Sequence, residues 1–464
     1  MVLSGAQRHR SHAGSRHVVD DGAGTPGLPA RRAAARLLAA VVDKKTPLDG
    51  LTDDEHGHPD YRALDQRDRG LVRAILATAL RFRMTIAALI ERRLDRPLPA
   101  NATALAHILH VGAAQILFLD IPDSAAVNLA VVHAKSDPRT ERFSGVVNGV
   151  LRELVRRKAR ALPAALAEST DAPAWFIERL EAAYGKDGAA ANLAMHRVEA
   201  PTDFTVRSDP DRWAEAFGGF VLPTGSVRVP HLDRAVPDLP GFEDGQWWVQ
   251  DAAAALPARL LGEVAGRRVA DLCAAPGGKT AQLAVAGAKV TAVEASANRL
   301  RRLSGNLARL GLDVEIVEAD LTKYAPATPF DAVLLDAPCS STGTVRRHPD
   351  VPWTKSPEDI LKLASVQARL LSHAAAMVAP GGLLVFSNCS LDPAEGEDMV
   401  AEFLQGRTDF SRDPVRPGEF PGVDDFINAR GELRTTPAGL PAEDPSRAGL
   451  DGFFAARFRK SAPG

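Results

Sequence analysis

The sequence predicts a multidomain protein in which an all-helical domain precedes an α/β domain with a mostly parallel, doubly wound sheet. Its 464 residues correspond to about three structural units at ~150 residues each. From Arg31 to about Leu166, apolar residues recur at spacings of three and four, which is typical of helices. From Trp247 onward, short apolar runs alternate with helical segments, which is typical of parallel strands joined by crossover helices.

The composition is that of a globular protein. Apolar residues make up 45% of the chain and charged residues 25%, which excludes disorder over most of its length. No apolar run reaches the roughly 18 residues of a membrane span, and the N-terminus lacks the apolar core of a signal peptide. We therefore expect a cytoplasmic protein without membrane contact. The formal net charge of −2 does not by itself indicate a nucleic-acid partner.

Residues 1–29 are rich in Gly, Ser, His and Arg without apolar periodicity, which predicts a disordered extension. We interpret it as a solvated tail, with RNA contact through its arginines as the alternative. Residues 30–166 then form the predicted all-helical domain. Its helical stretches are Ala33–Val42, Gly70–Ile90, Ala104–Phe118 and Ala125–Ala134.

The last part of this helical domain is basic. Residues 134–160 carry eight Lys or Arg against three Asp or Glu, an excess of five positive charges. Such a patch can bind phosphates, but a run of charges is also typical of a solvated helix face, so both interpretations stay open. The candidate RNA contacts here are Arg142, Arg152 and Arg156.

Residues 167–245 read as a connecting α+β subdomain, with a helix near Trp175–Tyr184, a strand near Phe204–Arg207, and many Pro and Gly residues afterwards. Residues 246–464 form the predicted α/β domain. Its first five strands are expected at Arg267–Cys273, Lys289–Glu294, Val314–Val317, Phe330–Asp336 and Leu383–Ser387, the last reached through Pro380–Gly382. A late strand is expected at Phe453–Phe458.

The chain has three cysteines, and each follows a predicted strand. Cys273 follows the first strand, Cys339 the fourth and Cys389 the fifth. So few cysteines exclude a disulfide framework, and their spacing fits neither a four-ligand zinc site nor a Cys-x-x-Cys redox pair, so we expect no metal. Buried cysteines are commonly inert. However, strands one, four and five are usually neighbours in such sheets, which would gather all three thiols in one ligand-binding crevice.

The turn after the first strand has the character of a cofactor site. Gly277 and Gly278 allow close backbone approach, and the following helix offers free N–H groups. A phosphate-binding P-loop would need glycine where Cys273 stands. Glu294 ends the second strand and can accept hydrogen bonds from ribose hydroxyls, while Asp320 follows the third strand and can meet an adenine edge. These positions indicate a nucleoside-containing cofactor, either a dinucleotide or S-adenosylmethionine.

The other two cysteines suggest nucleophilic chemistry. A thiolate that adds to C6 of cytosine makes C5 nucleophilic, and a nearby Asp can hydrogen-bond N3 of the base. Cys339 belongs to the segment Asp336–Gly343, and Cys389 belongs to Ser387–Leu391. Two thiols at one pocket would allow one to attack and the other to assist release.

The segments Asp271–Thr280, Asp336–Thr344 and Asn388–Leu391 resemble the motifs of RNA 5-methylcytosine methyltransferases that use S-adenosylmethionine. The resemblance implies that Cys389 is the nucleophile, whereas DNA cytosine methyltransferases attack with the thiol of their Pro-Cys motif. It further implies that Cys339 assists product release and that Asp336 positions the base. The implied cofactor contacts are Cys273, Ala274, Ala275, Pro276, Gly277, Gly278, Lys279, Glu294, Asp320 and Asp336.

Further segments resemble one branch of this family and an additional N-terminal domain. Thr344–Trp353 and Val249–Asp251 look like the bacterial RsmB (Fmu, Sun) branch that acts on 16S rRNA, and Ala126–Asn128 and Val147–Arg152 resemble the RNA-binding NusB domain. The resemblance covers residues 31–461 and implies a Rossmann-like methyltransferase domain after a NusB-like domain. Two residues depart from the family pattern, since Asn388 replaces Thr and Glu294 replaces Asp. Arg346 and Arg347 join the candidate RNA contacts.

Together these features predict a monomeric enzyme that methylates C5 of a cytosine in 16S rRNA through a cysteine adduct at C6. Two alternatives are the same chemistry on tRNA and a non-catalytic RNA-binding ribosome assembly factor. The complete set of cofactor and thiol residues argues against the second alternative.

Overall fold

The computed structural model describes residues 24–462, which fall into two compact units. The first unit holds the described residues up to Ala39 together with Thr52–Leu76 and Ile86–Ala164. The second holds Ala40–Leu51, Ala77–Thr85 and the chain from Ala165 onward. Most of the predicted extension, residues 1–23, lies outside the described residues, and the first helix already begins at Leu28.

The N-terminal region is helical throughout its described residues, and the all-α prediction for it is confirmed. α6 (Thr103–Phe118) is buried on nearly every side, because its sequence is apolar around the whole helix. Gly112 lets α6 approach α8 closely, since a Cβ there would lie 2.7 Å from Leu151 Cδ1. The predicted single helix at 70–90 is two helices. The remaining helices are α1 (Leu28–Lys44), α2 (Leu48–Leu51), α3 (Pro59–Arg62), α4 (Gln66–Arg81), α5 (Arg83–Glu91), α7 (Asp123–Lys135) and α8 (Ser144–Glu168).

Two segments from the predicted helical domain pack within the second unit. Lys45 Nζ donates to the carbonyl of Trp353 at 2.6 Å, and the Trp353 indole N–H donates to the carbonyl of Leu80 at 3.2 Å. The backbone N–H of Leu48 donates to Asp350 Oδ2 at 2.9 Å. These hydrogen bonds explain why 40–51 and 77–85 belong with the C-terminal chain, although helical periodicity alone assigned them to the first domain.

A small antiparallel sheet of order β2-β3-β1-β4 follows α9 (Ala174–His196). Its strands are β1 (Thr202–Val206), β2 (Phe220–Val221), β3 (Val227–Val229) and β4 (Trp247–Val249), with α10 (Pro210–Phe217) packed against β2 and β3. Trp247 is fully buried and packs edge-on against the rings of Phe204 and Phe217, which also contact each other. Only β1 was predicted, because strands of two or three residues show no alternation.

The large sheet has the order β10-β12-β9-β8-β5-β6-β7, and β11 pairs with β12. The pairs from β9 to β7 are parallel, whereas β12 is antiparallel to β9. The predicted adjacency of strands one, four and five is therefore confirmed as β5, β8 and β9. The strands are β5 (Arg268–Leu272), β6 (Lys289–Glu294), β7 (Glu315–Glu318), β8 (Phe330–Asp336), β9 (Val378–Asn388), β10 (Phe410–Arg412), β11 (Leu433–Thr435) and β12 (Phe453–Lys460).

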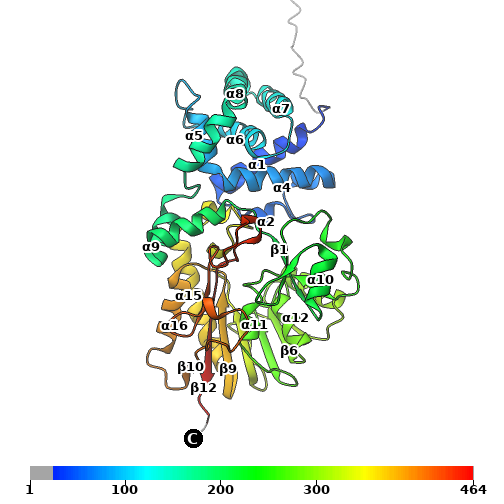
Figure 1. Cartoon of the computed structure of the whole chain (residues 1–464), viewed down its shortest axis with the longest axis vertical. Coiled ribbons are helices and arrows are strands. Elements are labelled where there is room, and N and C mark those ends of the chain that lie inside the picture. Colours follow the sequence, from blue (N-terminus) through cyan, green and yellow to red (C-terminus); the bar gives the residue numbers. More distant parts are fainter. Residues whose placement is uncertain (1–23, 463–464) are drawn as a thin grey trace, which may run out of the picture. The chain divides into compact units, whose positions relative to one another are not determined.

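Helices cover both faces of this sheet, as the doubly wound prediction requires (Figure 1). Val333 and Leu335 of β8 pack in the core with residues of α15 (Pro357–Ala376) and α16 (Glu397–Leu404). The alternate residues Ala332 and Leu334 pack in a second core with residues of α11 (Leu256–Arg259) and α12 (Gly278–Val285). The connections also include α13 (Ala297–Arg309) and α14 (Val351–Thr354).

The fifth predicted strand, Leu383–Ser387, begins earlier than expected, because Pro380–Gly382 already lie inside β9. The pairing of β8 with β9 shifts register between Phe330 and Ala332, and Gly381 has a φ of +78°. This irregularity lets the strand continue through a Pro-Gly-Gly sequence that would otherwise end it.

Candidate active site

A cavity of about 580 Å³ opens at the carboxyl ends of β5, β8 and β9. Its lining includes the turn Cys273–Lys279, Asp336 and Cys389. The structure thus brings the predicted cofactor turn, base-positioning residue and nucleophile to one cavity, although together they span more than a hundred residues of the sequence.

The cofactor turn has no room for larger side chains. Gly277 has a φ of +107°, and a Cβ on it would lie 2.7 Å from Leu303 Cδ1. Gly278 begins α12, and a Cβ there would lie 3.3 Å from the Gln250 amide. Cys273 also has a positive φ of 62°, and burial raises the pKa of its thiol to about 12. This cysteine is therefore a neutral part of the turn at physiological pH.

The acids predicted to bind a nucleoside follow adjacent strands. Glu294 ends β6 and is 4% exposed. Its Oε1 accepts from the backbone N–H of Ser296 at 3.0 Å, whereas Oε2 makes no hydrogen bond and lies 3.4 Å from Arg299 Nη1. A buried carboxylate oxygen without a hydrogen bond fits a donor supplied by a ligand, such as a ribose hydroxyl. Asp320 is exposed after β7, and hydrogen bonds from Thr322 lower its pKa.

Asp336 is held from two sides at the end of β8. Lys279 Nζ lies 2.8 Å from Asp336 Oδ2, and Ser387 Oγ donates to Asp336 Oδ1 at 2.9 Å. The Lys279 ammonium also lies 4.9 Å from the centre of the Phe453 ring. The carboxyl group therefore has a fixed orientation in the cavity wall.

The two remaining thiols face each other. Cys339 Sγ and Cys389 Sγ are 3.4 Å apart, and Ser341 Oγ lies 3.6 Å from Cys389 Sγ. The hydrogen bond with Cys339 lowers the pKa of Cys389 below the usual thiol value, and the Lys279 charge acts in the same direction. The same hydrogen bond, together with burial, raises the pKa of Cys339 well above it. Cys389 is therefore the thiol of this pair that ionises first.

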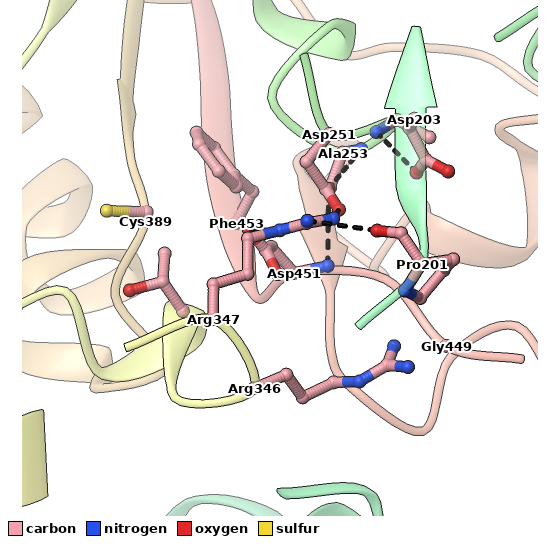
Figure 2. A network of polar contacts seen from close by, with 12 residues as sticks. Pro201, Asp203, Asp251, Ala253, Arg346, Arg347, Cys389, Gly449, Asp451 and Phe453 are labelled. Carbon is pink, nitrogen blue, oxygen red and sulfur yellow. Dashed lines mark hydrogen bonds and ion pairs between the residues drawn. The ribbon is translucent and has the colours of Figure 1, made fainter. Parts of the chain in front are cut away.

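Arg346 and Arg347, predicted as RNA contacts, belong to an internal polar network (Figure 2). Arg347 forms ion pairs with Asp251 at 2.7 Å and Asp451 at 3.1 Å and donates to the carbonyl of Pro201 at 3.0 Å. Arg346 is 1% exposed and donates to the carbonyls of Ala448 and Glu199. Arg346 therefore reaches no RNA phosphate, while Arg347 reaches the cavity wall with its charge already paired.

The basic candidates of the helical domain lie on its surface. Arg142, Arg152 and Arg156 are all exposed. Arg152 donates to Asn148 Oδ1 at 2.9 Å, and Arg142 stacks 4.7 Å from the centre of the Phe143 ring. Their exposure leaves the guanidinium groups accessible to a phosphate backbone.

Between residues 24 and 462, no group of three or more His, Cys, Asp or Glu side chains could hold a metal ion. Within the same range, no helix is both long enough and apolar enough to cross a membrane.

Several residues near the site were not predicted. Asp271 lies behind the cofactor turn, where burial raises its pKa to about 7. Asp451 lies two residues before the last strand, and its Oδ1 is buried without a hydrogen bond. Glu395 lies beneath both cysteine-bearing loops. The only sequence signal for Glu395 is that a serine follows both Cys339 and Cys389, which supplies hydroxyl donors on both loops.

Comparison with known proteins adds to this geometry. The family description "16S rRNA methyltransferase RsmB/F" matches residues 258–459, and the NusB family matches residues 28–156. Ribosomal RNA small subunit methyltransferase B of Xylella fastidiosa is 37% identical, with 94% of this chain and 98% of that protein covered. The protein of the same description from Pseudomonas syringae pv. tomato is 33% identical, covering 93% and 97%.

Solved structures share the fold. The crystal structure of PH0851 has a TM-score of 0.68 at 23% identity, covering 93% of this chain and 98% of that one. A methyltransferase homolog protein from Pyrococcus horikoshii has a TM-score of 0.50 at 25% identity, covering 67% of this chain and 98% of that one. The predicted fold class and both predicted resemblances are confirmed. The chain belongs to the RsmB/F family of 16S rRNA methyltransferases and carries a NusB-family domain at its N-terminal end.

Proposed function

We propose that this protein uses S-adenosylmethionine to methylate C5 of a cytosine in 16S rRNA. The observation that carries the proposal is the pair of thiols 3.4 Å apart, of which Cys389 lines the same cavity as the cofactor turn and Asp336. The curated relatives described as small-subunit methyltransferase B support the choice of RNA.

The residues present fit S-adenosylmethionine. Glu294 Oε2 is a buried acceptor without a hydrogen bond, and the crowded glycines of the turn leave backbone open to a ligand. Cys273–Lys279, Glu294, Asp320 and Asp336 would hold the cofactor, with Glu294 accepting from the ribose hydroxyls. When bound, the cofactor supplies an electrophilic methyl group.

Cys389 acts as the nucleophile. Its thiolate forms a bond to C6 of the cytosine, and the electron pair of the C5=C6 double bond moves into the ring toward N3. There Asp336 and its partner Lys279 place a proton that neutralises the developing charge. The electron pair gained by the ring makes C5 the atom that takes the methyl group. Water takes the proton from C5, and the electron pair of that C–H bond re-forms the C5=C6 double bond of the ring. The bond between C6 and Cys389 breaks, its electron pair returns to the sulfur, and N3 gives its proton back.

Cys339 assists this last step. Its pKa is raised, so it is a protonated thiol at neutral pH and lies within hydrogen-bond distance of Cys389. A proton donor at that distance stabilises the departing sulfur as negative charge returns to it. The assignment explains why two thiols with different proton affinities stand together.

RNA binding involves the NusB-family domain. The exposed residues Arg142, Arg152 and Arg156 supply positive charge, which attracts a phosphate backbone without reading its sequence. We further propose that the protein acts as a monomer in the cytoplasm, where its ribosomal RNA substrate is found.

Methyl transfer from labelled S-adenosylmethionine to unmodified 16S rRNA tests this function, with bulk tRNA as a parallel substrate. The expected result is label in 16S rRNA as 5-methylcytosine. Label in tRNA alone would support the tRNA alternative. Cofactor-independent RNA binding without any methyl transfer would support the assembly-factor alternative. In RNA containing 5-fluorocytidine, C5 cannot lose a proton, so the expected covalent adduct should map to Cys389.

A further inference from the structure

Glu395 binds both loops that carry the paired thiols. It ends the short helix η4 (Pro393–Glu395) and is fully buried. Its Oε1 accepts from the backbone N–H of Ser340 at 2.9 Å, and its Oε2 accepts from Ser340 Oγ at 2.5 Å and Ser390 Oγ at 2.6 Å. Ser340 directly follows Cys339, and Ser390 directly follows Cys389. One carboxylate therefore connects the residues next to both thiols.

The carboxylate is fully used within the protein. Gln367 Nε2 donates to Glu395 Oε1 at 2.8 Å, so each oxygen accepts two hydrogen bonds. A carboxylate offers about four acceptor positions, which leaves little capacity for a substrate or cofactor. Removing a carboxylate from water costs several kcal/mol, and burial accordingly raises the pKa of Glu395. The role of this buried carboxylate is therefore to hold Ser340 and Ser390 in place.

Asn388 adds further hydrogen bonds between Glu395 and the loop after β9, although this residue departs from the family pattern. Its Nδ2 donates to the carbonyl of Glu395 at 2.5 Å, and its Oδ1 accepts from the backbone N–H of Ser390 at 3.0 Å. The backbone N–H of Gly343 donates to the carbonyl of Cys389 at 2.9 Å. The loop after β8 and the loop after β9 are thus joined at several points, and all of these contacts lie beneath the two sulfur atoms.

The separation of the thiols affects the pKa of Cys389. The Cys339–Cys389 hydrogen bond lowers the pKa of Cys389 and weakens steeply as the sulfur atoms separate. Other charged groups also act on these thiols, namely Asp336 and Lys279 on Cys389 and Glu395 on Cys339. Of these, Glu395 is the one that is hydrogen-bonded to both loops.

We infer that Glu395 is a positioning residue that holds Cys339 and Cys389 at hydrogen-bond distance and thereby keeps Cys389 reactive and its product releasable. The inference rests on the proposed function for the release step, but the reactivity of the thiol can be measured without RNA or cofactor. In Glu395→Ala, the two loops lose their common anchor. Glu395→Gln keeps the volume, and its amide can reach the same partners because serine hydroxyls also accept hydrogen bonds.

The test measures the alkylation rate of each cysteine by iodoacetamide across pH, with mass spectrometry of the peptides. Cys273 is the internal reference, because none of these contacts involves it. Glu395→Ala should slow Cys389 alkylation at pH 7 about tenfold, the effect of one unit of thiol pKa, while Glu395→Gln should slow it less than about threefold. Glu402→Ala, which removes an exposed glutamate of α16, is the matched control and should match wild type.

Release is the second readout. On unmodified RNA, Glu395→Ala should accumulate the covalent adduct and lower kcat more than it changes KM for S-adenosylmethionine. Thermal unfolding shows whether Glu395→Ala is folded, and if it is not, the double variant Ser340→Ala/Ser390→Ala takes its place with the same expectations.

Unchanged Cys389 alkylation in the folded variant would overturn the inference. If wild type transfers no methyl group but the variant still slows alkylation, the proposed function fails and the positioning role stands. If methyl transfer occurs in wild type and alkylation is insensitive to the variant, the positioning role fails alone.

Discussion

Cys339 Sγ lies 3.4 Å from Cys389 Sγ, and the two thiols have opposite shifts in pKa. The pair comes from loops after two neighbouring parallel strands, β8 and β9. Because the pKa of Cys339 is raised and that of Cys389 is lowered, the arrangement separates a proton donor from a nucleophile. The separate roles proposed for attack and release follow from this difference.

Replacing Cys339 by Ala should slow attack by Cys389, because the hydrogen bond that lowers its pKa is lost, and should slow release more. The variant should accumulate a covalent protein–RNA complex, because Cys389 forms its bond to C6 but lacks the neighbouring S–H as it departs. A slow-migrating band on a denaturing gel measures this complex. Ser365→Ala, at an exposed position of α15, is the control and should form no stable adduct. A Cys339→Ala enzyme that turns over like wild type, without the band, would exclude the release role.

Replacing Glu294 by Gln should weaken S-adenosylmethionine binding roughly tenfold, since a charged acceptor for hydroxyl donors is worth about 1.5 kcal/mol more than a neutral one. RNA affinity should not change. Calorimetric titration with the cofactor measures the effect, and Glu358→Gln, at an exposed position of α15, provides the control. Equal cofactor affinity in both variants would remove Glu294 from the ribose site.

The stability of the protein should decrease as pH rises toward 7, owing to Asp271. Burial raises the pKa of this carboxyl to about 7 in the folded state, whereas an unfolded Asp titrates near 3.9. Between these values the folded state binds the additional proton, so the free energy of unfolding falls with pH by at most about 1.4 kcal/mol per unit.

Asp271→Asn should flatten this dependence, because the amide cannot titrate and still accepts the hydrogen bond from Thr280. Urea unfolding at several pH values between 4 and 8 measures how the free energy of unfolding changes with pH. The expected change in this slope corresponds to roughly one bound proton. Asp425→Asn, at an exposed position, should retain the wild-type slope. An unaltered slope in Asp271→Asn would mean that this carboxyl is ionised when buried.

Replacing Arg142, Arg152 and Arg156 by Gln in one triple variant should weaken RNA binding. Each lost phosphate contact lowers the salt dependence of the binding constant by about 0.7 to 0.9 in logarithmic slope. Filter binding at several salt concentrations measures this, and kcat at saturating RNA should be unchanged. The control neutralises the exposed residues Arg62, Arg67 and Arg96 of the same region. Equal losses in both triple variants would show a general charge effect rather than a binding face.

Much of the α/β domain could be predicted because its signals are local. β6 and β8 have the predicted bounds, since buried strands read as continuous apolar runs between turns. The adjacency of β5, β8 and β9 also followed from general rules for parallel sheets. These rules placed Cys339 near Cys389 before any distance was known. In contrast, β2, β3 and β4 are too short to show a period.

The internal role of Arg346 could not be predicted, because a basic dipeptide on a loop has the same appearance whether it faces solvent or buried carboxylates. Its partners come from distant parts of the chain, at Glu199 and Ala448. The role of Glu395 could not be predicted for the same reason, because it depends on two serines that come together only in the folded protein. The spacing of sequence motifs identifies the side chains that react. The side chains that hold them in place can be identified only from the contacts in the folded structure.

The most direct test of the central claim is bisulfite sequencing of 16S rRNA after incubation with S-adenosylmethionine and either the wild-type protein or Cys389→Ala. The account predicts a cytosine protected from conversion by the wild-type protein and none protected by Cys389→Ala. Protection that persists in Cys389→Ala, or no protected cytosine with the folded wild-type protein, would contradict it.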